Sequence, residues 1–187
     1  MDENVILSIF IAKYNRKEIV VNKIKELLRI QSNEFDIFVL DDASGDGTTD
    51  ALKQIKDLRL HIGTNSERVG ILKDGAMPNW YHLLEMCDGD FALHLNDRDL
   101  IDSNGVIELI EFLKNHPTVT GGICNLTGGR IYESPESSFM AVPYFESHPT
   151  GVVFYMDEYR LLENREHLFT KEVAYIHPHD LILGRLA

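Results

Sequence analysis

The sequence predicts an α/β protein with a mostly parallel central sheet. Short, almost continuously apolar segments at residues 5–11, 35–40 and 91–95 have the length and composition of strands that are covered on both faces. A segment with apolar side chains at helical spacing, residues 17–30, separates the first two of these strands. Strands that alternate with helices imply parallel pairing and right-handed crossovers.

The elements follow this alternation along the chain. After the helix at 17–30 and the strand at 35–40, we expect a helix near 48–56 and a short strand at 58–62. A loop at 63–77 leads to a second set of elements. These are a helix at 78–86, the strand at 91–95, a helix at 103–115 capped by Ser103, and strands at 121–126 and 152–155.

Composition limits the classes of protein that need to be considered. A chain of 187 residues is one ordinary domain, and its net charge of −12 argues against nucleic acid or an anionic membrane surface as the main partner. Two cysteines, Cys87 and Cys124, are too few and too far apart for a disulfide framework or a zinc site. No apolar run approaches the roughly 18 residues that a transmembrane helix needs, and the N-terminus does not resemble a signal peptide. We therefore expect a cytoplasmic protein.

The stretch from Phe35 to Thr49 is the most informative part of the sequence. A buried strand ends at two adjacent carboxylates, Asp41 and Asp42, and small turn-forming residues lead into the next helix. Carboxylates repel phosphate, so this pair suits a neutral polar group such as a ribose hydroxyl or a base N–H. The alternative is that Asp46 or Ser44 caps the helix and that the two acids are solvated turn residues.

Three strand ends are expected to bring polar residues to one edge of the sheet. Tyr14 follows the first strand, Asp41 and Asp42 follow the second, and Asp97 and Asp99 follow the strand at 91–95. In open α/β sheets, ligands bind outside the carboxyl ends of the strands. This convergence therefore indicates a binding site.

The motifs AKYNR, VLDDASGDGT and NDRD, which occur in this order, resemble those of the inverting glycosyltransferases of family 2. The resemblance covers residues 5–102 well and the remainder loosely. It implies a GT-A-type, Rossmann-like three-layer sandwich forming a single domain over 1–187. Residues 1–102 would form the half that binds the nucleotide sugar, and 103–187 the acceptor half.

The resemblance also implies roles for individual residues on the donor side. Ala12 and Tyr14 match residues that flank and stack on the nucleobase, and Asp42 matches the acceptor of a hydrogen bond from uracil or ribose. Lys73 lies where a basic residue approaches the base or the diphosphate. The complete set expected to bind the donor nucleotide is Ala12, Tyr14, Asp41, Asp42, Lys73, Asp97 and Arg98.

The acidic motif after the strand at 91–95 departs from the family pattern, which is close to D-x-D-D. Counting from Gly89-Asp90 places Asn96 at its first position and Arg98 at the main metal-ligand position. One interpretation is that Asp99 and Asp97 bind Mn²⁺ or Mg²⁺ at the diphosphate. The other is that Arg98 replaces the metal, because a guanidinium can neutralise the same charge. A surface salt bridge of Arg98 with its neighbouring acids remains a third interpretation.

The resemblance places the acceptor side in the second half of the chain. His148, Thr150, Gly151 and His179 are expected to line the acceptor pocket. Asp180 is the candidate catalytic base, which would take the proton from the acceptor hydroxyl as this oxygen attacks the anomeric carbon. A structural role for Asp180 as the N-cap of the last helix is the alternative.

The predicted function is transfer of a sugar from a nucleoside-diphosphate sugar to a hydroxyl of a saccharide or of a lipid-linked acceptor. The transfer would invert the anomeric carbon. UDP is the favoured nucleotide because it is the usual one in the family that the sequence resembles. A degenerate module that binds nucleotide sugars without turnover is the alternative, because of Asn96 and Arg98 and because the chain ends soon after Asp180. That ending indicates a truncated or a minimal enzyme. A dehydrogenase or nucleotidyltransferase is less well supported, since AKYNR contains no glycine-rich loop. Peripheral membrane association and the oligomeric state stay open.

Overall fold

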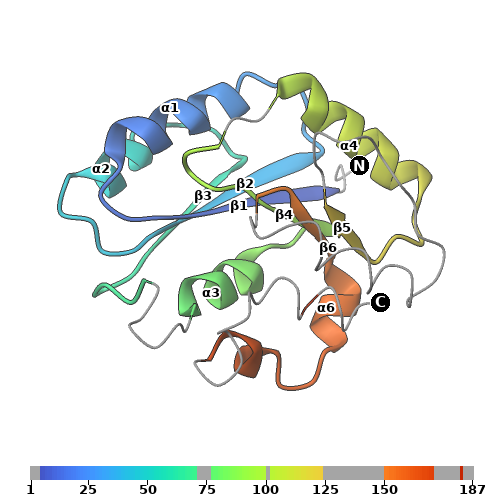
Figure 1. The fold of residues 1–187 in the computed structure, drawn as a ribbon. Helices are drawn as coiled ribbons and strands as arrows, with labels where there is room; N and C mark the ends of the chain where they lie inside the picture. Colours follow the sequence, from blue (N-terminus) through green and yellow to red (C-terminus); the bar gives the residue numbers. More distant parts are fainter. Residues whose placement is uncertain (1–4, 71–76, 100–101, 124–149, 171–181, 183–187) are drawn as a thin grey trace.

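The computed structural model describes residues 5–70, 77–99, 102–123, 150–170 and 182. Within these residues, six strands form one sheet in the order β3-β2-β1-β4-β6-β5 (Figure 1). The strands are β1 (Leu7–Lys13), β2 (Phe35–Asp41), β3 (Leu60–Thr64), β4 (Phe91–His94), β5 (Gly121–Ile123) and β6 (Val152–Tyr155). The helices are α1 (Lys17–Leu27), α2 (Thr48–Lys53), α3 (Pro78–Met86), α4 (Ser103–Asn115), α6 (Met156–Leu161) and the short 3-10 helix η1 (Arg165–Phe169).

The sheet is mostly parallel, as the sequence predicts. β1 lies between β2 and β4 and is parallel to both, and β3 extends the parallel part beyond β2. β6 is antiparallel to β4 and to β5, so the direction of the strands reverses at one side of the sheet. The amino end of β6 therefore lies at the same edge as the carboxyl end of β4.

Helices cover both faces of the sheet and give three layers (Figure 1). The alternation of side chains along β1 assigns Ile9 to one core and Phe10 to the other. The first core lies under α1, α2 and α4, and their buried residues include Val20, Leu52 and Ile110.

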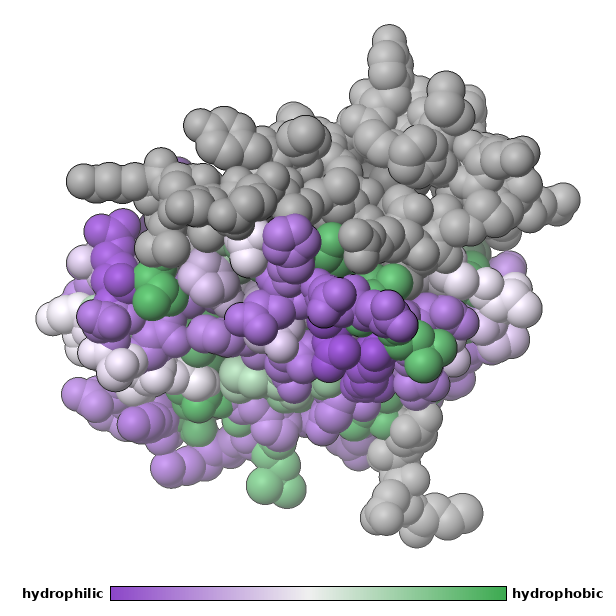
Figure 2. Space-filling view, turned by 90° about the horizontal axis from the view of Figure 1, so that it is seen from below, coloured by the Kyte–Doolittle hydropathy of each residue, from purple (hydrophilic) through white to green (hydrophobic). Residues whose placement is uncertain are grey.

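The second core lies between the opposite face of the sheet and α3, α6 and η1. Trp80 and Leu83 of α3 pack there with Phe10, and the Trp80 and Phe10 rings meet edge to face at 5.5 Å. Tyr159 of α6 is fully buried in the same core. The outer surface of this layer is mainly hydrophilic where it can be seen from below (Figure 2). None of the helices in the described part of the chain is both long and apolar enough to cross a bilayer.

The element boundaries differ from the predicted ones mainly at strand and helix ends. β3 begins at Leu60 and leaves Leu58 97% exposed, because a turn from Asp57 to Leu60 precedes the strand. The N-cap of α4 is Asp102, which accepts a hydrogen bond from the Asn104 N–H, and not Ser103. The helices α6 and η1 were not predicted, since both are short and contain charged residues on several faces.

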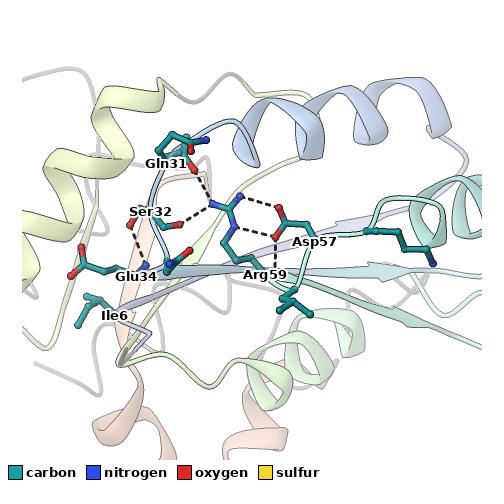
Figure 3. A pocket seen from close by; sticks show the side chains of 10 residues that line it. Ile6, Gln31, Ser32, Glu34, Asp57 and Arg59 are labelled. Atoms are coloured by element: carbon teal, nitrogen blue, oxygen red, sulfur yellow. Dashed lines mark hydrogen bonds and ion pairs between the residues drawn. The ribbon is translucent and has the colours of Figure 1, made fainter. Parts of the chain in front are cut away.

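Arg59 lies at the edge of the sheet where the amino ends of β2 and β3 meet, and it connects several segments of the chain there. Its guanidinium donates to the backbone carbonyls of Leu28, Ile30 and Ser32, at 2.8 to 2.9 Å, and to the Asp57 carboxylate. A shallow pocket surrounds this group (Figure 3). Because these donors are taken up by the protein, we interpret the pocket as a structural junction that ends α1 and aligns β2 with β3.

We predict that Arg59→Met lowers the free energy of unfolding by about 2 to 4 kcal/mol, because carbonyl and carboxylate acceptors lose a charged donor. Urea unfolding at neutral pH measures this change. Arg29→Met, at an exposed position near the end of α1, is the matched control and should cost less than about 0.5 kcal/mol. Equal losses in the two variants would contradict a structural role for Arg59.

Candidate functional site

The carboxyl ends of β1, β2 and β4 lie side by side at one edge of the sheet. Lys13 at the end of β1 is in register with Asp41 at the end of β2, and Phe10 is in register with His94 at the end of β4. The chain continues from β1 to β2 and β3 on one side, and β4 lies on the other side of β1. A reversal of this kind leaves a crevice outside the carboxyl ends, where open α/β sheets bind ligands.

A fully buried ion pair joins the ends of β1 and β2. Lys13 Nζ lies 3.0 Å from Asp41 Oδ1 and also donates to Ser44 Oγ at 2.9 Å. The Ser44 N–H donates to Asp41 Oδ1, and the Thr49 hydroxyl donates to Asp41 Oδ2. Burial opposes ionisation of Asp41, but the hydrogen bonds from Ser44, Thr49 and Lys13 outweigh it and lower the carboxyl pKa. Asp41 thus supports the loop that follows β2, and a direct role in donor binding stays a prediction.

Asp42, the second acid of the pair, is 2% exposed and organises the loop after β3. Its oxygens accept hydrogen bonds from the Asn65 side chain at 2.8 Å, from the Val69 N–H at 2.9 Å and from the Gly70 N–H at 2.8 Å. Gly70 has a φ of +41°, and a Cβ there would lie 3.2 Å from Asp42 Oδ2. A glycine is therefore needed for this loop to close on the carboxylate.

The same loop reaches Tyr14, at the end of β1. The Arg68 guanidinium lies over the Tyr14 ring, 4.0 Å from its centre, in a cation–π contact. Ala12 and Tyr14 are half-buried at this position. The structure thus brings Tyr14 and Asp42 together through residues 65–70, as the convergence of strand ends predicts.

Asp46 links the first turns of two helices. One of its carboxylate oxygens accepts from the Lys17 N–H at the start of α1, and the other accepts from the Thr48 N–H at the start of α2. The N-cap of α2 is Gly47, so the expectation that Asp46 or Ser44 caps this helix is wrong, although the Asp46 carboxylate does accept from N–H groups in the first turn of both helices. Ser44 has a different role, because its hydroxyl oxygen accepts from the Asn15 N–H at 2.8 Å.

Asp97 and Asp99 follow β4 and have different partners. Asp97 is 2% exposed, and both of its oxygens accept from Arg16 Nη1, at 2.7 and 3.0 Å. Asp99 accepts a hydrogen bond from the hydroxyl of Thr150, whose oxygen also accepts from the Asn96 N–H at 3.1 Å. The Gly151 N–H donates to the carbonyl of His94. Thr150 and Gly151, predicted to line the acceptor pocket, therefore lie beside the acidic motif.

Two basic residues at this edge were not singled out in the sequence. Arg16 is part of the AKYNR motif, but its partner is 81 residues away. Lys23 lies on the buried face of α1. Burial lowers the pKa of Lys23, while the nearby carboxylates of Glu26, Asp99 and Asp97 favour its charged form. The signal for Lys23 was its spacing from Val20 and Leu27, which places it on the apolar face.

One of the remaining predicted site residues is exposed, and the others lie outside the described part of the chain. Arg98 is exposed, in a turn between its two acidic neighbours. Lys73, His148, His179 and Asp180 lie outside the described residues. Among residues 5–70, 77–99, 102–123 and 150–170, no three His, Cys, Asp or Glu side chains form a cluster that could hold a metal ion.

A parallel sheet with polar side chains at its switch point is the arrangement of nucleotide-binding α/β proteins. The family model of glycosyl transferase family 2 matches residues 8–170, which is most of the chain. The protein therefore belongs to this family. The GT-A fold expected from the sequence is confirmed.

Solved structures with the same fold include glycosyltransferases with different donors. The S. aureus TarS fragment 1–349 aligns with a TM-score of 0.65 and 17% identity, over 97% of this chain and 55% of that chain. The mannosyltransferase PcManGT from Pyrobaculum calidifontis, in complex with GDP-Man and Mn²⁺, aligns at 0.64 with 17% identity, over 93% and 50%. Glucosyl-3-phosphoglycerate synthase from Mycobacterium tuberculosis, with Mn²⁺, UDP and glucosyl-3-phosphoglycerate, aligns at 0.51 with 15% identity, over 81% and 57%. The chain thus spans about half the length of these structures.

The lowered pKa of Asp41 gives stability a defined dependence on pH. The contribution of its carboxylate should be complete above the ordinary carboxyl pKa of about 3.9 and should be lost as the pH falls through the lower folded-state value. Asp41→Asn leaves Lys13 buried without its charge partner, so we expect a loss of about 3 kcal/mol at neutral pH. The difference from the wild type should shrink below about pH 4.

Urea unfolding at a series of pH values from 7 to 2.5 measures this difference. Asp50→Asn, at an exposed position of α2, is the control and should change stability by less than about 0.5 kcal/mol at each pH. A difference between wild type and Asp41→Asn that stays constant down to the lowest pH would contradict the role of the buried pair.

Proposed function

We propose that this chain is a glycosyltransferase domain that binds a nucleoside-diphosphate sugar at the carboxyl edge of β1, β2 and β4. The observation that carries the proposal is the convergence of Tyr14, Asp42 and Asp97 at the switch point of the sheet. The family assignment and the nucleotide complexes of structures with the same fold, one with GDP-Man and one with UDP, support it. Residues 1–102 form the donor half in this proposal, and residues 103–187 belong to the acceptor half.

On the donor side, Ala12 and Tyr14 would contact the nucleobase. Asp42 would hold the loop at 65–70 beside the nucleobase. It would also accept a hydrogen bond from the base or the ribose. Lys73, three residues beyond Gly70, follows this loop closely enough in the chain to reach the same ligand. UDP is our preferred nucleotide, and GDP is the natural comparison because the PcManGT complex contains GDP-Man.

The carboxylates of the acidic motif are suitable ligands for a divalent cation, Mn²⁺ or Mg²⁺. Mg²⁺ is often held by one or two carboxylates together with substrate phosphates, so it does not need a preformed cluster of three protein ligands. Asp99 is our first candidate ligand, with Asp97 as the second, although Arg16 already contacts both oxygens of Asp97. When bound, the cation would neutralise charge on the diphosphate leaving group. Arg98 remains the alternative source of positive charge.

For the transfer step, we propose that Asp180 accepts the proton of the acceptor hydroxyl. The acceptor would be a saccharide or lipid-linked hydroxyl, and Thr150, Gly151, His148 and His179 would line its pocket. Attack from the face opposite the leaving diphosphate inverts the anomeric carbon and needs one carboxylate base. Thr150, which contacts Asp99, supports this proposal by connecting the acceptor segment to the acidic motif.

Nucleotide binding gives the first test. At a concentration 100 times its Kd, UDP should stabilise the protein by about 2.7 kcal/mol, because it binds only the folded state. For a chain of this size, that corresponds to a rise in Tm of roughly 5 to 10 °C. The measurement is a thermal-shift titration with UDP, GDP and ATP, each with and without Mn²⁺. Equal shifts for UDP, GDP and ATP, or no shift with any of them, would contradict the proposed donor site.

The catalytic assignment needs a separate test. Asp180→Asn should reduce the release of nucleoside diphosphate from a nucleotide sugar by about 100-fold or more, because general base catalysis contributes this much. Its affinity for UDP should stay within a factor of two of the wild type. Glu163→Gln, at an exposed position outside the proposed site, is the control. Unchanged release in Asp180→Asn would show that Asp180 is not the base.

The same assay addresses the second candidate function, a module that binds the donor without transferring sugar. The exposed Arg98 at the main metal-ligand position of the motif favours it. UDP binding by the wild type with no nucleoside diphosphate release, with or without metal, would support this second function.

A further inference from the structure

The ion pair between Arg16 and Asp97 crosses the switch point of the sheet. Arg16 lies three residues after the end of β1, and Asp97 lies three residues after the end of β4. Because β1 and β4 are parallel neighbours, the pair joins their carboxyl ends, at the edge where open α/β sheets bind ligands. A ligand bound between these two strand ends would lie near the guanidinium.

The two members of the pair differ in exposure. The Asp97 side chain is 3% exposed, whereas the Arg16 side chain is 32% exposed. The carboxylate is therefore the inner, fixed member, and the guanidinium lies between it and solvent. An arginine held in this way loses less conformational freedom when it binds a ligand.

Among the described residues, the hydrogen bonds of the Arg16 side chain involve one nitrogen of the guanidinium. Both hydrogen bonds to Asp97 come from Nη1. The fork of an arginine also carries N–H donors on Nη2 and Nε, and this planar arrangement matches the oxygens of a phosphate. Both Asp97 oxygens, in contrast, accept from the arginine. In this arrangement, Asp97 holds the Arg16 guanidinium in place.

Positive groups lie next to the carboxylates of Asp97 and Asp99. Arg16 and Lys23 face Asp97 and Asp99 at this edge. The amino end of α1, an eleven-residue helix that begins at Lys17, adds the partial positive charge of the helix dipole. The Asp46 carboxylate already accepts from the Lys17 N–H at this amino end. The Arg16 guanidinium is thus a positive group that a diphosphate would meet at this edge, although the whole chain carries a charge of −12.

We infer that Arg16 binds the diphosphate of the nucleotide donor and that Asp97 is the positioning residue that holds Arg16 at the crevice. This inference rests on the proposed function, because it names a contact of the same donor site. It makes Asp97 an indirect participant in donor binding. It also gives the diphosphate a protein cation in addition to any divalent metal.

Isothermal titration calorimetry on the purified chain, with UDP and uridine and with GDP and guanosine, tests the inference. Arg16→Gln should weaken binding of the nucleoside diphosphate about 10- to 100-fold, with and without Mg²⁺, because a charge-assisted contact is lost. Binding of the nucleoside should stay within a factor of two. Asp97→Asn should give a smaller, phosphate-dependent loss, because the guanidinium remains but is held less firmly.

Two further variants keep the test decisive. Arg29→Gln removes the same charge at an exposed position near the opposite end of α1 and should leave binding of the nucleoside diphosphate unchanged. Arg16→Lys keeps the charge without the planar fork, and we expect an intermediate affinity. It also serves as the test variant if Arg16→Gln does not fold, as judged by its circular dichroism spectrum.

The outcomes separate the inference from the proposed function. If the wild type binds UDP or GDP and Arg16→Gln binds it equally well, the inference is wrong and the donor site stands. The inference is also wrong if Arg16→Gln weakens the nucleoside as much as its diphosphate, since that result would indicate a general loss of structure at the site. If the wild type binds neither nucleotide, the proposed donor site itself is wrong.

Discussion

The buried ion pair between Lys13 and Asp41 is the interaction on which the functional edge of this protein depends. Removing two charges from water is costly, and the cost is offset here by their mutual attraction and by hydrogen bonds from Ser44 and Thr49. The Asp42 N–H donates to the carbonyl of Lys13 at 3.0 Å, so the same junction fixes the start of the next acidic residue. The junction between Lys13 and Asp41 therefore positions Asp42. The Asp42 carboxylate in turn holds the loop at 65–70.

The fold could be predicted from the sequence because the information is local. The alternation of apolar strands with amphipathic helices determines the parallel sheet, and parallel pairing brings Tyr14, Asp41 and Asp97 to one edge. The partners of these residues could not be predicted in the same way. Arg16 contacts a residue 81 positions away, and Arg68 reaches Tyr14 from a loop whose path depends on Asp42. Such contacts depend on the packed structure, which no local pattern encodes.

The distribution of charge is compatible with the anionic donor that we propose for this acidic protein. The chain as a whole carries −12, which predicts poor binding of nucleic acids and other polyanions. Several cations nevertheless lie at this edge, and three of those in the described residues come from one short stretch of the chain: Lys13, Arg16 and Lys23. Each is close to a carboxylate that is itself buried or half-buried. For the proposed donor, the placement of these cations matters more than the net charge of the chain.

The reversed direction of β6 has a consequence for how specificity can change. Because β6 is antiparallel to β4, the residues that precede it arrive at the same edge as the residues that follow β4. Thr150 and Gly151 consequently contact the end of β4 without any distortion of the parallel strands. In the proposed function, substitutions at Thr150 and Gly151 would change the acceptor side beside the acidic motif, while the β1–β2–β4 scaffold is left intact. The orientation of this one strand would then allow the proposed acceptor side to change independently of the proposed donor side.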